Sequence, residues 1–258
     1  MDLGIAGRHA LVCGSSQGLG LACAKALLCE GVNVTLNGRD IKKLEKAADT
    51  LRGLGGEVST VAADQSTVEG RDAIIAAVGD LDILVNNNAG PRPGALADWD
   101  VDALIGAVNA NLIPAVQFLR SFIPGMRARK FGRIVNITSA MVKSPRYFMG
   151  LSTAARAGLT AISKAISIEV VRDNVTINNL LPERIDTPRQ EFMAKRIMEE
   201  QRVDREEARR QIADTIAAKR FGRPEEFAAA CAFLCSSQAS FISGQNLQLD
   251  GGSYEGLI

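Results

Sequence analysis

Short runs of β-branched and other apolar residues alternate with longer helical patterns along the whole chain. The segments between the runs place apolar residues three and four positions apart, as on one face of a helix. Seven runs have the length and composition of strands: 9–13, 32–36, 58–63, 82–86, 133–137, 175–180 and 246–249. This alternation predicts an α/β fold with a doubly wound, seven-stranded parallel sheet covered by helices on both faces.

No linker or internal repeat divides the chain, so we predict one domain over residues 1–258. Only the segment 189–220 departs from the pattern, because it is rich in Glu, Arg and Lys and lies between the sixth strand and the final helix. It follows the carboxyl end of a strand, where ligands bind in open α/β sheets. We therefore expect a helical lid over a ligand cleft; the alternative is a solvated helical pair.

The charge balance argues against large charged partners. Lys and Arg number 30 against 29 Asp and Glu, a net charge of about +1, so we expect neither nucleic acid nor a membrane surface as a partner. Apolar stretches such as 227–235 are shorter than the roughly 18 residues of a membrane span, and the first residues lack the pattern of a signal peptide. We expect a cytoplasmic protein that binds a small molecule.

The cysteines and the histidine exclude other chemistry. The five cysteines form no CxxC pair and are odd in number, which predicts buried, reduced thiols and no metal site; they are Cys13, Cys23, Cys29, Cys231 and Cys235. His9 is the only histidine and lies within the first predicted strand, so Ser-His-Asp hydrolysis is not expected.

The first strand leads into Gly14-Ser-Ser-Gln-Gly18-Leu-Gly20, and a helical pattern follows. Glycines let the turn tighten and let backbone N–H groups approach a pyrophosphate at the start of the helix. In this strand-loop-helix context the loop predicts a dinucleotide site on a Rossmann-type fold.

Further motifs follow in a fixed order: Asn87–Gly90 after the fourth strand, Gly132–Ser139 along the fifth, Asn178–Pro182 with Thr187 after the sixth, and Gly244–Gly252 near the end. In this order and spacing they resemble the classical short-chain dehydrogenases/reductases, especially the 3-oxoacyl-carrier-protein reductase branch. The resemblance covers essentially the whole chain. It implies an oxidoreductase that acts on a small carbonyl or alcohol with a nicotinamide cofactor.

The resemblance also implies roles for single residues. Asn111 matches the asparagine that holds a proton-relay water, and Ser139 matches the serine that hydrogen-bonds the substrate carbonyl. The implied cofactor-binding residues are Gly14, Ser16, Gly18, Leu19 and Gly20 of the phosphate loop, Asp64 at the adenine, Asn88 and Gly90 beside the adenosine, Arg156 at the ribose and Thr187 at the nicotinamide amide.

The end of the second strand bears on the choice of cofactor. An Asp or Glu there would bind the ribose hydroxyls of NAD, whereas this chain reads Leu36-Asn37-Gly38-Arg39. Arg39 is able to accept a 2′-phosphate, so NADP(H) is predicted over NAD(H). The alternative is that Arg39 is only a solvated residue at the start of the next helix.

The catalytic pair departs from the family pattern. Where the family has a tyrosine and, four residues later, a lysine, this chain has Ser152 and Arg156. A serine hydroxyl is a much weaker acid than a phenol, and an arginine cannot deprotonate to tune its partner. We therefore expect weak or altered hydride chemistry, with cofactor binding retained.

Other side chains near this position leave alternatives open. Tyr147 lies in the loop before the helix, where it lines a hydrophobic substrate pocket or, alternatively, folds back toward Ser139 as a displaced acid, with Lys143 nearby. Glu183 stands where the family usually has glycine, and acts as a general base or pairs with Arg184.

Two classes of function follow from these residues. The first is an NADP(H)-dependent oxidoreductase; the alternative is a non-redox enzyme, such as a carbon–carbon lyase of retro-aldol type, or a cofactor-binding protein without turnover. The predicted helices 98–127 and 152–172 resemble those through which the family assembles, and the first carries extra apolar residues at Val116, Phe118, Leu119, Phe122 and Ile123. We expect a homotetramer with dihedral symmetry.

Overall fold

A computed structural model describes residues 2–257 and has one seven-stranded sheet in the order β3-β2-β1-β4-β5-β6-β7. Every neighbouring pair is parallel. The strands are β1 (His9–Val12), β2 (Asn33–Gly38), β3 (Val58–Ala62), β4 (Ile83–Asn86), β5 (Gly132–Ile137), β6 (Val175–Pro182) and β7 (Asn246–Leu249). The predicted doubly wound parallel sheet is confirmed.

Two strands continue further than the sequence pattern predicts. β2 extends through Asn37 to Gly38, although Asn37 is polar and buried. Its side-chain amide donates to Val61 O and Ala63 O, at 3.0 and 3.1 Å, and these bonds replace the hydrogen bonds to water that the amide loses on burial. β6 likewise extends to Pro182. Arg39 is therefore the first residue beyond the carboxyl end of β2.

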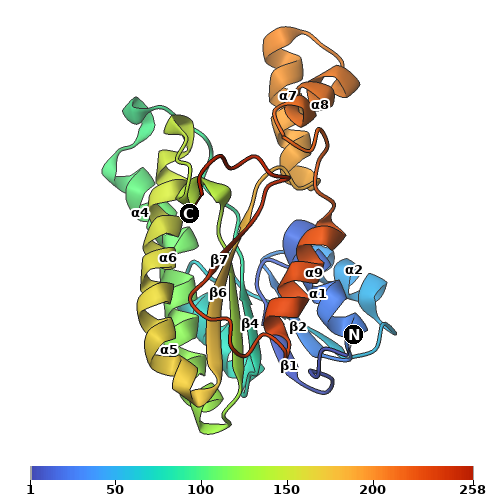
Figure 1. The fold of residues 1–258 in the computed structure, drawn as a ribbon, viewed down its shortest axis with the longest axis vertical. Helices are drawn as coiled ribbons and strands as arrows, with labels where there is room; N and C mark the ends of the chain where they lie inside the picture. The colour runs from blue at the N-terminus through green and yellow to red at the C-terminus, as the bar shows by residue number, and fades with distance from the viewer. Residues whose placement is uncertain (1, 258) are drawn as a thin grey trace.

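Helices cover both faces of the sheet (Figure 1). On one face lie α1 (Gly18–Cys29), α2 (Ile41–Leu51) and α9 (Pro224–Cys235); on the other lie α3 (Val68–Val78), α4 (Val101–Asn111), α5 (Ile113–Ala128) and α6 (Gly150–Val170). Alternate residues of β1 point to the two layers, since Ala10 and Val12 belong to one buried cluster and Leu11 to the other.

The segment 189–220 forms a helical pair, α7 (Pro188–Gln201) and α8 (Arg205–Asp214), which projects beyond the carboxyl edge of the sheet (Figure 1). Ala194, Ala208 and Ile212 give it a small core of its own. Arg209 donates to Glu191 and to Asp186, both at 2.8 Å, which fixes α8 to α7 and to the segment after β6. Short 3₁₀ helices complete the fold: η1 (Leu96–Asp98), η2 (Ala140–Val142), η3 (Tyr147–Met149) and η4 (Val171–Asp173).

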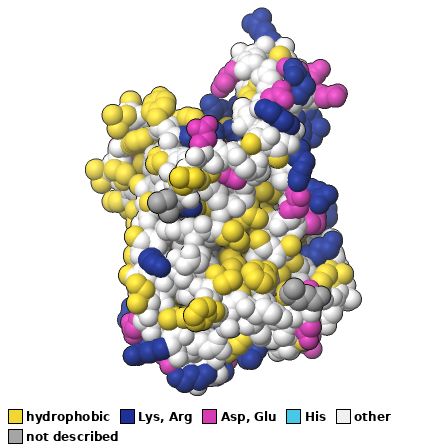
Figure 2. Space-filling view, in the orientation of Figure 1, with side chains coloured by type: hydrophobic (Ala, Val, Ile, Leu, Met, Phe, Trp, Pro, Cys, Tyr) yellow, Lys and Arg dark blue, Asp and Glu magenta, His cyan; other side chains and the backbone are white. Residues whose placement is uncertain are grey.

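The apolar residues expected on an assembly surface of α5 are mostly core residues, and that expectation was wrong. Phe118, Leu119, Phe122 and Ile123 are buried against the sheet, because the apolar stripe of α5 is the face that it turns inward. The exposed apolar side chains lie on and before α4, where Leu96, Val101, Leu104 and Ile105 are each more than 40% exposed. Figure 2 shows hydrophobic side chains gathered at this end of the molecule.

Two further expectations need correction. The helical stretch Val101–Ala128 is long and apolar enough to cross a membrane by length and composition, although core helices also meet that test and α5 packs its inner face on the sheet. Among the cysteines, four are buried as expected, but Cys29 is exposed at the end of α1. All five are free thiols.

Candidate active site

The predicted cofactor and catalytic residues converge at the carboxyl edge of the sheet, where loops from β1, β4, β5 and β6 meet. Parallel strands end at the same edge, so motifs far apart in sequence come together there. His9 is not part of this site, because its ring nitrogens bond to Asp80 O and Thr35 Oγ1, at 2.9 and 2.8 Å. Among residues 2–257, no group of His, Cys, Asp and Glu is placed to hold a metal ion.

The loop after β1 passes very close to the segment at the end of β4. Gly14 has φ +55°, and a Cβ there would lie 2.9 Å from Asn87 Nδ2. That amide donates to Gly14 O at 3.1 Å and so ties the loop to the end of β4. A Cβ on Gly20 would lie only 2.4 Å from Gly14 O, so both positions require glycine.

The start of α1 presents free backbone donors. Gln17 at the N-cap makes no side-chain capping bond, and the first turn has no acidic residue, while Leu19 packs on the core. The first N–H groups of a helix lack intrahelical partners and favour an anion. Thr187 lies next to the loop, its Cβ 3.9 Å from the position of a Cβ on Gly18 (φ +62°), so the glycine loop and the start of α7 are neighbours in a cradle at this edge of the sheet.

Arg39 and Asp64 form the far end of this cradle. The Arg39 guanidinium is 75% exposed and lies 3.8 Å from Asp64 Oδ2, while Gly38 packs beside Ser16 of the loop. Burial raises the pKa of Asp64, but hydrogen bonds from Ser66 and the Arg39 cation outweigh it and hold that pKa below its ordinary value. Asp64 is therefore ionised at neutral pH.

Arg156 is a buried clamp at the centre of the site. Its Nη1 donates to Ile137 O and Thr138 O, at 2.7 and 2.9 Å, and its Nη2 donates to Asn88 O at 3.1 Å. With Nε donating to Ser152 Oγ at 3.3 Å, four of its five N–H groups are engaged within the protein. Burial, and to a smaller extent Arg189, lower the pKa of Arg156 to about 10, so it stays protonated at neutral pH.

Ser152 lies one turn before Arg156 on α6 and is buried beneath Gly90. A Cβ on Gly90 would lie 3.2 Å from Ser152 Oγ and 3.6 Å from Arg156 Nη2, so the loop after β4 passes close over the pair. Ser139 follows β5, is half-buried, and its Oγ accepts from Met141 N at 3.2 Å. The structure thus brings Ser139, Ser152 and Arg156 to neighbouring segments at the ends of β5 and α6.

Asn111 borders a small cavity of about 20 Å³, which Arg156 and Asn86 also line. That volume holds about one water molecule. The Asn111 side chain donates to Ala89 O at 3.4 Å, and its buried Oδ1 has no hydrogen-bond partner among the described residues. Its placement agrees with the water-holding role that the resemblance implies.

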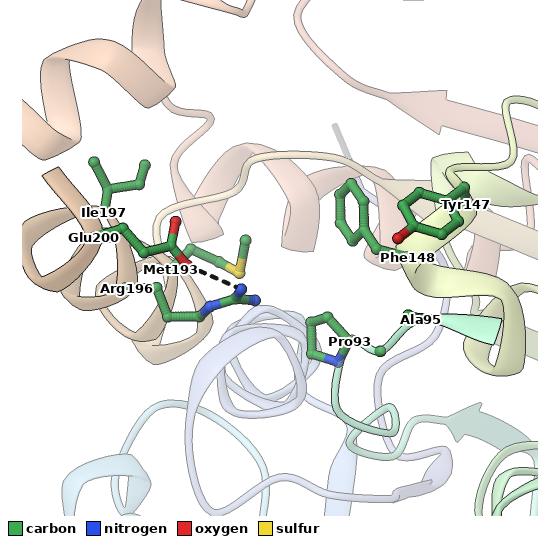
Figure 3. Close-up of a pocket in the computed structure, with 9 residues that line it drawn as sticks. Pro93, Ala95, Tyr147, Phe148, Met193, Arg196, Ile197 and Glu200 are labelled. Atoms are coloured by element: carbon green, nitrogen blue, oxygen red, sulfur yellow. Dashed lines mark hydrogen bonds and ion pairs between the residues drawn. The ribbon is translucent and has the colours of Figure 1, made fainter. Parts of the chain in front are cut away.

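A larger pocket of about 370 Å³ opens between η3 and α7 (Figure 3). Tyr147, Phe148 and Pro93 face it from one side and Met193 and Ile197 from the other, with the Arg196–Glu200 ion pair at its edge. Tyr147 is 71% exposed and stands edge-on to Phe148, with ring centroids 6.5 Å apart. Of the two interpretations of Tyr147, the structure favours a pocket-lining residue.

Glu183 forms an ion pair with Arg146 of the loop between η2 and η3, and not with Arg184, which was one of the two alternatives for this residue. Arg184 itself adopts φ +56°. Lys143 lies over the ring of Tyr254, which belongs to the C-terminal segment. Its Nζ is 5.2 Å from the ring centroid.

One feature of the site was missed from the sequence: a ladder of four asparagines across adjacent strands. Asn86, Asn136, Asn179 and Asn246 occupy paired positions on β4 to β7. Each amide donates to the next Oδ1, at 2.8 to 2.9 Å. Asn136 also donates to Ser163 of α6 at 2.9 Å, which fixes the helix that carries Ser152 and Arg156. The signal was available as an asparagine within each of these four strands.

The chain is similar to known proteins over nearly its whole length. The family model described as "Enoyl-(Acyl carrier protein) reductase" matches residues 14–254. The "NADPH-dependent reductase BacG" of Bacillus subtilis (strain 168) is 31% identical over 256 residues, covering 97% of this chain and 99% of that protein. The "3-oxoacyl-[acyl-carrier-protein] reductase FabG" of Vibrio harveyi is 30% identical, covering 98% and 99%.

A solved structure agrees with this likeness. The crystal structure of L-sorbose reductase from Gluconobacter frateurii, complexed with NADPH and L-sorbose, superposes with a TM-score of 0.95 at 33% identity and covers 100% of both chains. The whole fold, including the helical pair α7 and α8, therefore has a counterpart in a protein of known structure.

Proposed function

The chain belongs to the classical short-chain dehydrogenase/reductase family, in its 3-oxoacyl-acyl-carrier-protein reductase-like branch, and from this premise we propose that it is an NADPH-dependent reductase of a small carbonyl compound. The observation that carries the proposal is the arrangement at the ends of β5 and α6. There a buried cation, Arg156, holds Ser152 beside the segment of Ser139.

The residues present fit a nicotinamide dinucleotide. The uncapped start of α1 and the tight crossing of Gly14 and Gly20 suit a pyrophosphate, and Thr187 faces the loop from α7. When bound, this cofactor supplies a hydride to the carbonyl carbon. Arg156 has one N–H group left for a ribose hydroxyl, so its main contribution to the cofactor site is to hold the loops in place.

The proton chemistry rests on the serines. Ser152 Oγ accepts a hydrogen bond from Arg156 Nε, so its own O–H is available to donate to the substrate oxygen. Ser139 supplies a second hydroxyl, and the Arg156 cation stabilises negative charge that develops on that oxygen. Because a serine is a poor general acid, we expect turnover about 10²- to 10⁴-fold below that of a site with a well-placed phenol.

The preference for NADPH over NADH rests on Arg39, which is exposed directly after Gly38, at the end of β2, where no acidic residue stands. Relatives named as NADPH-dependent or complexed with NADPH support it. A lid role for α7 and α8 is part of the proposal, since α7 forms one wall of the 370 Å³ pocket.

We propose that the protein is a cytoplasmic homotetramer of dihedral symmetry. Two separate surfaces expose large apolar side chains: Leu104 and Ile105 on α4, and Phe233 on α9 with Leu247 on β7. Two distinct self-complementary patches are what such a tetramer needs. Light scattering that gave a monomer mass at micromolar concentration would exclude it.

NADPH oxidation on a panel of ketones, oxo esters and oxo acids tests the reductase activity, with Ser139→Ala and Tyr147→Phe as variants. We expect slow turnover that Ser139→Ala abolishes and Tyr147→Phe retains. Absence of turnover at saturating NADPH would refute the proposal, and cleavage of a substrate without NADPH consumption would favour the lyase. Loss of activity in Tyr147→Phe would instead identify the phenol as the acid.

A further inference from the structure

Arg184 lies in the segment after β6, next to the segment that carries Ser139, and its side chain has a buried nitrogen without a hydrogen bond in the described part of the chain. β5 and β6 pair with Ile137 opposite Leu180, so Pro182 runs alongside Ser139 and Arg184 follows two residues later. Its Nε is buried with no hydrogen-bond partner among the described residues. Burial, and then the nearby Arg146, lower the pKa of Arg184.

The charges around Arg184 leave a cation uncompensated. Glu183 is the carboxylate beside it and raises its pKa, but the Glu183 side chain bonds to Arg146. Arg184 is half-buried with its Nε fully buried, and removing such a cation from water is costly unless an anion pairs with it. A ligand carboxylate would supply that anion and match the planar guanidinium.

Two further arginines, Arg189 and Arg196, lie on α7. Burial and Arg196 lower the pKa of Arg189, and Arg189 in turn acts on Arg156. Glu200, also on α7, is paired with Arg196 at 3.2 Å. Cations that repel one another around a cleft favour an anionic ligand over a neutral one.

The backbone conformation at Arg184 also supports a functional role for this residue. Its φ of +56° lies in the left-handed region, where glycine is the least strained residue. The hydrogen bond from Gly222 N to Arg184 O, at 3.1 Å, holds this conformation. The chain therefore places a long cation where a glycine would fold more easily, as strained positions at functional sites do.

We propose that the substrate is an oxo acid whose carboxylate is bound by Arg184, with its apolar body directed toward the pocket that Tyr147, Phe148 and Met193 line. This substrate class rests on the proposed reductase function. The pocket volume of about 370 Å³ lies in the range of sites that enclose small organic ligands.

Calorimetric binding to the protein saturated with NADP⁺ tests this without turnover. The probes are benzoylformate and 4-oxo-4-phenylbutanoate, each compared with its own methyl ester. Of the two acids, we expect the one with the higher affinity to bind about tenfold more tightly than its own methyl ester, which is the effect of one charge-assisted hydrogen bond. Arg184→Met should remove the preference without weakening ester binding, while Lys195→Met, at an exposed cation on α7, should preserve it.

Arg184→Gly is a second variant that relieves the backbone, so it should fold with an unchanged or higher Tm and also lose the preference. Equal binding of acids and esters to the wild type would overturn the proposal, as would a preference that survives Arg184→Met, or weaker NADP⁺ binding in that variant. Acid-selective binding without NADPH oxidation would support the carboxylate site and refute the reductase activity. NADPH oxidation without a preference for acids would support the reductase activity and refute the carboxylate site.

Discussion

Replacing Arg156 by Met tests whether this residue is a structural clamp. The change keeps a long, flexible side chain but removes donors from three buried carbonyl groups, Ile137 O, Thr138 O and Asn88 O. Leaving a buried acceptor unpaired costs about 1–3 kcal/mol each, and relief from burying a cation offsets part of that sum. We expect the free energy of unfolding to fall by about 2–4 kcal/mol.

Arg156→Lys separates charge from geometry. A lysine keeps the cation but has one nitrogen in place of the planar fork, so it cannot reach β5 and the loop after β4 together. We expect it to recover less than half of the stability that Arg156→Met loses. The same change introduces the lysine that the family usually has at this position. Similarity to the family would therefore predict a stable variant, whereas the lost hydrogen bonds predict a destabilised one.

Urea unfolding followed by tryptophan fluorescence measures both variants. Trp99 is the only tryptophan, and its ring packs against Gly150 at the first residue of α6, so it reports on the helix that carries the clamp. Arg120→Met, at an exposed arginine on α5, is the control and should change stability by less than about 0.5 kcal/mol. A loss below about 1 kcal/mol for Arg156→Met would refute the clamp.

Three further predictions concern other parts of the molecule. Arg39→Ala should weaken NADPH binding by about tenfold and leave NADH binding unchanged, as measured by fluorescence titration, and equal losses for both would contradict a 2′-phosphate contact. Arg220, then the Arg223 backbone N–H, hold the pKa of Glu226 at about 2, below its unfolded value, so the stabilisation is present above about pH 4.5 and is lost as the pH falls toward 2. Glu226→Gln should therefore flatten the loss of stability between those pH values in urea titrations, and an unchanged slope would oppose this assignment. Alkylation of the native protein at pH 8 should label Cys29 alone by mass spectrometry, because burial raises the pKa of Cys13 to about 12 and the other three thiols are also buried.

The fold followed from the sequence because periodicity reports burial. All seven strands lie where apolar runs predict them, and only their ends differ, since side-chain amides such as Asn37 extend a strand past its apolar residues. The same signal misled the expectation about α5. An apolar stripe shows that a face is buried, but it does not say whether a sheet or a second copy of the chain covers it.

The site was predicted as a set of residues but not as a set of contacts. The order of motifs placed Ser139, Ser152 and Arg156 together, whereas three of the four partners of Arg156 are backbone carbonyls, which no residue identity encodes. The pairing of Glu183 with Arg146 depends on the course of the loop between η2 and η3. The strain at Arg184 is likewise visible only in the backbone angles.

Transfer of deuterium from NADPH that carries deuterium at both hydrogen positions of the nicotinamide C4 most directly tests the central claim that Ser139, Ser152 and Arg156 support carbonyl reduction. The wild type and Ser139→Ala would be incubated with the labelled cofactor and the best ketone or oxo acid of the panel, and the alcohol analysed by mass spectrometry. We predict an alcohol with deuterium on the carbinol carbon from the wild type, and little or none from Ser139→Ala. An unlabelled product, or no product despite bound NADPH, would contradict it.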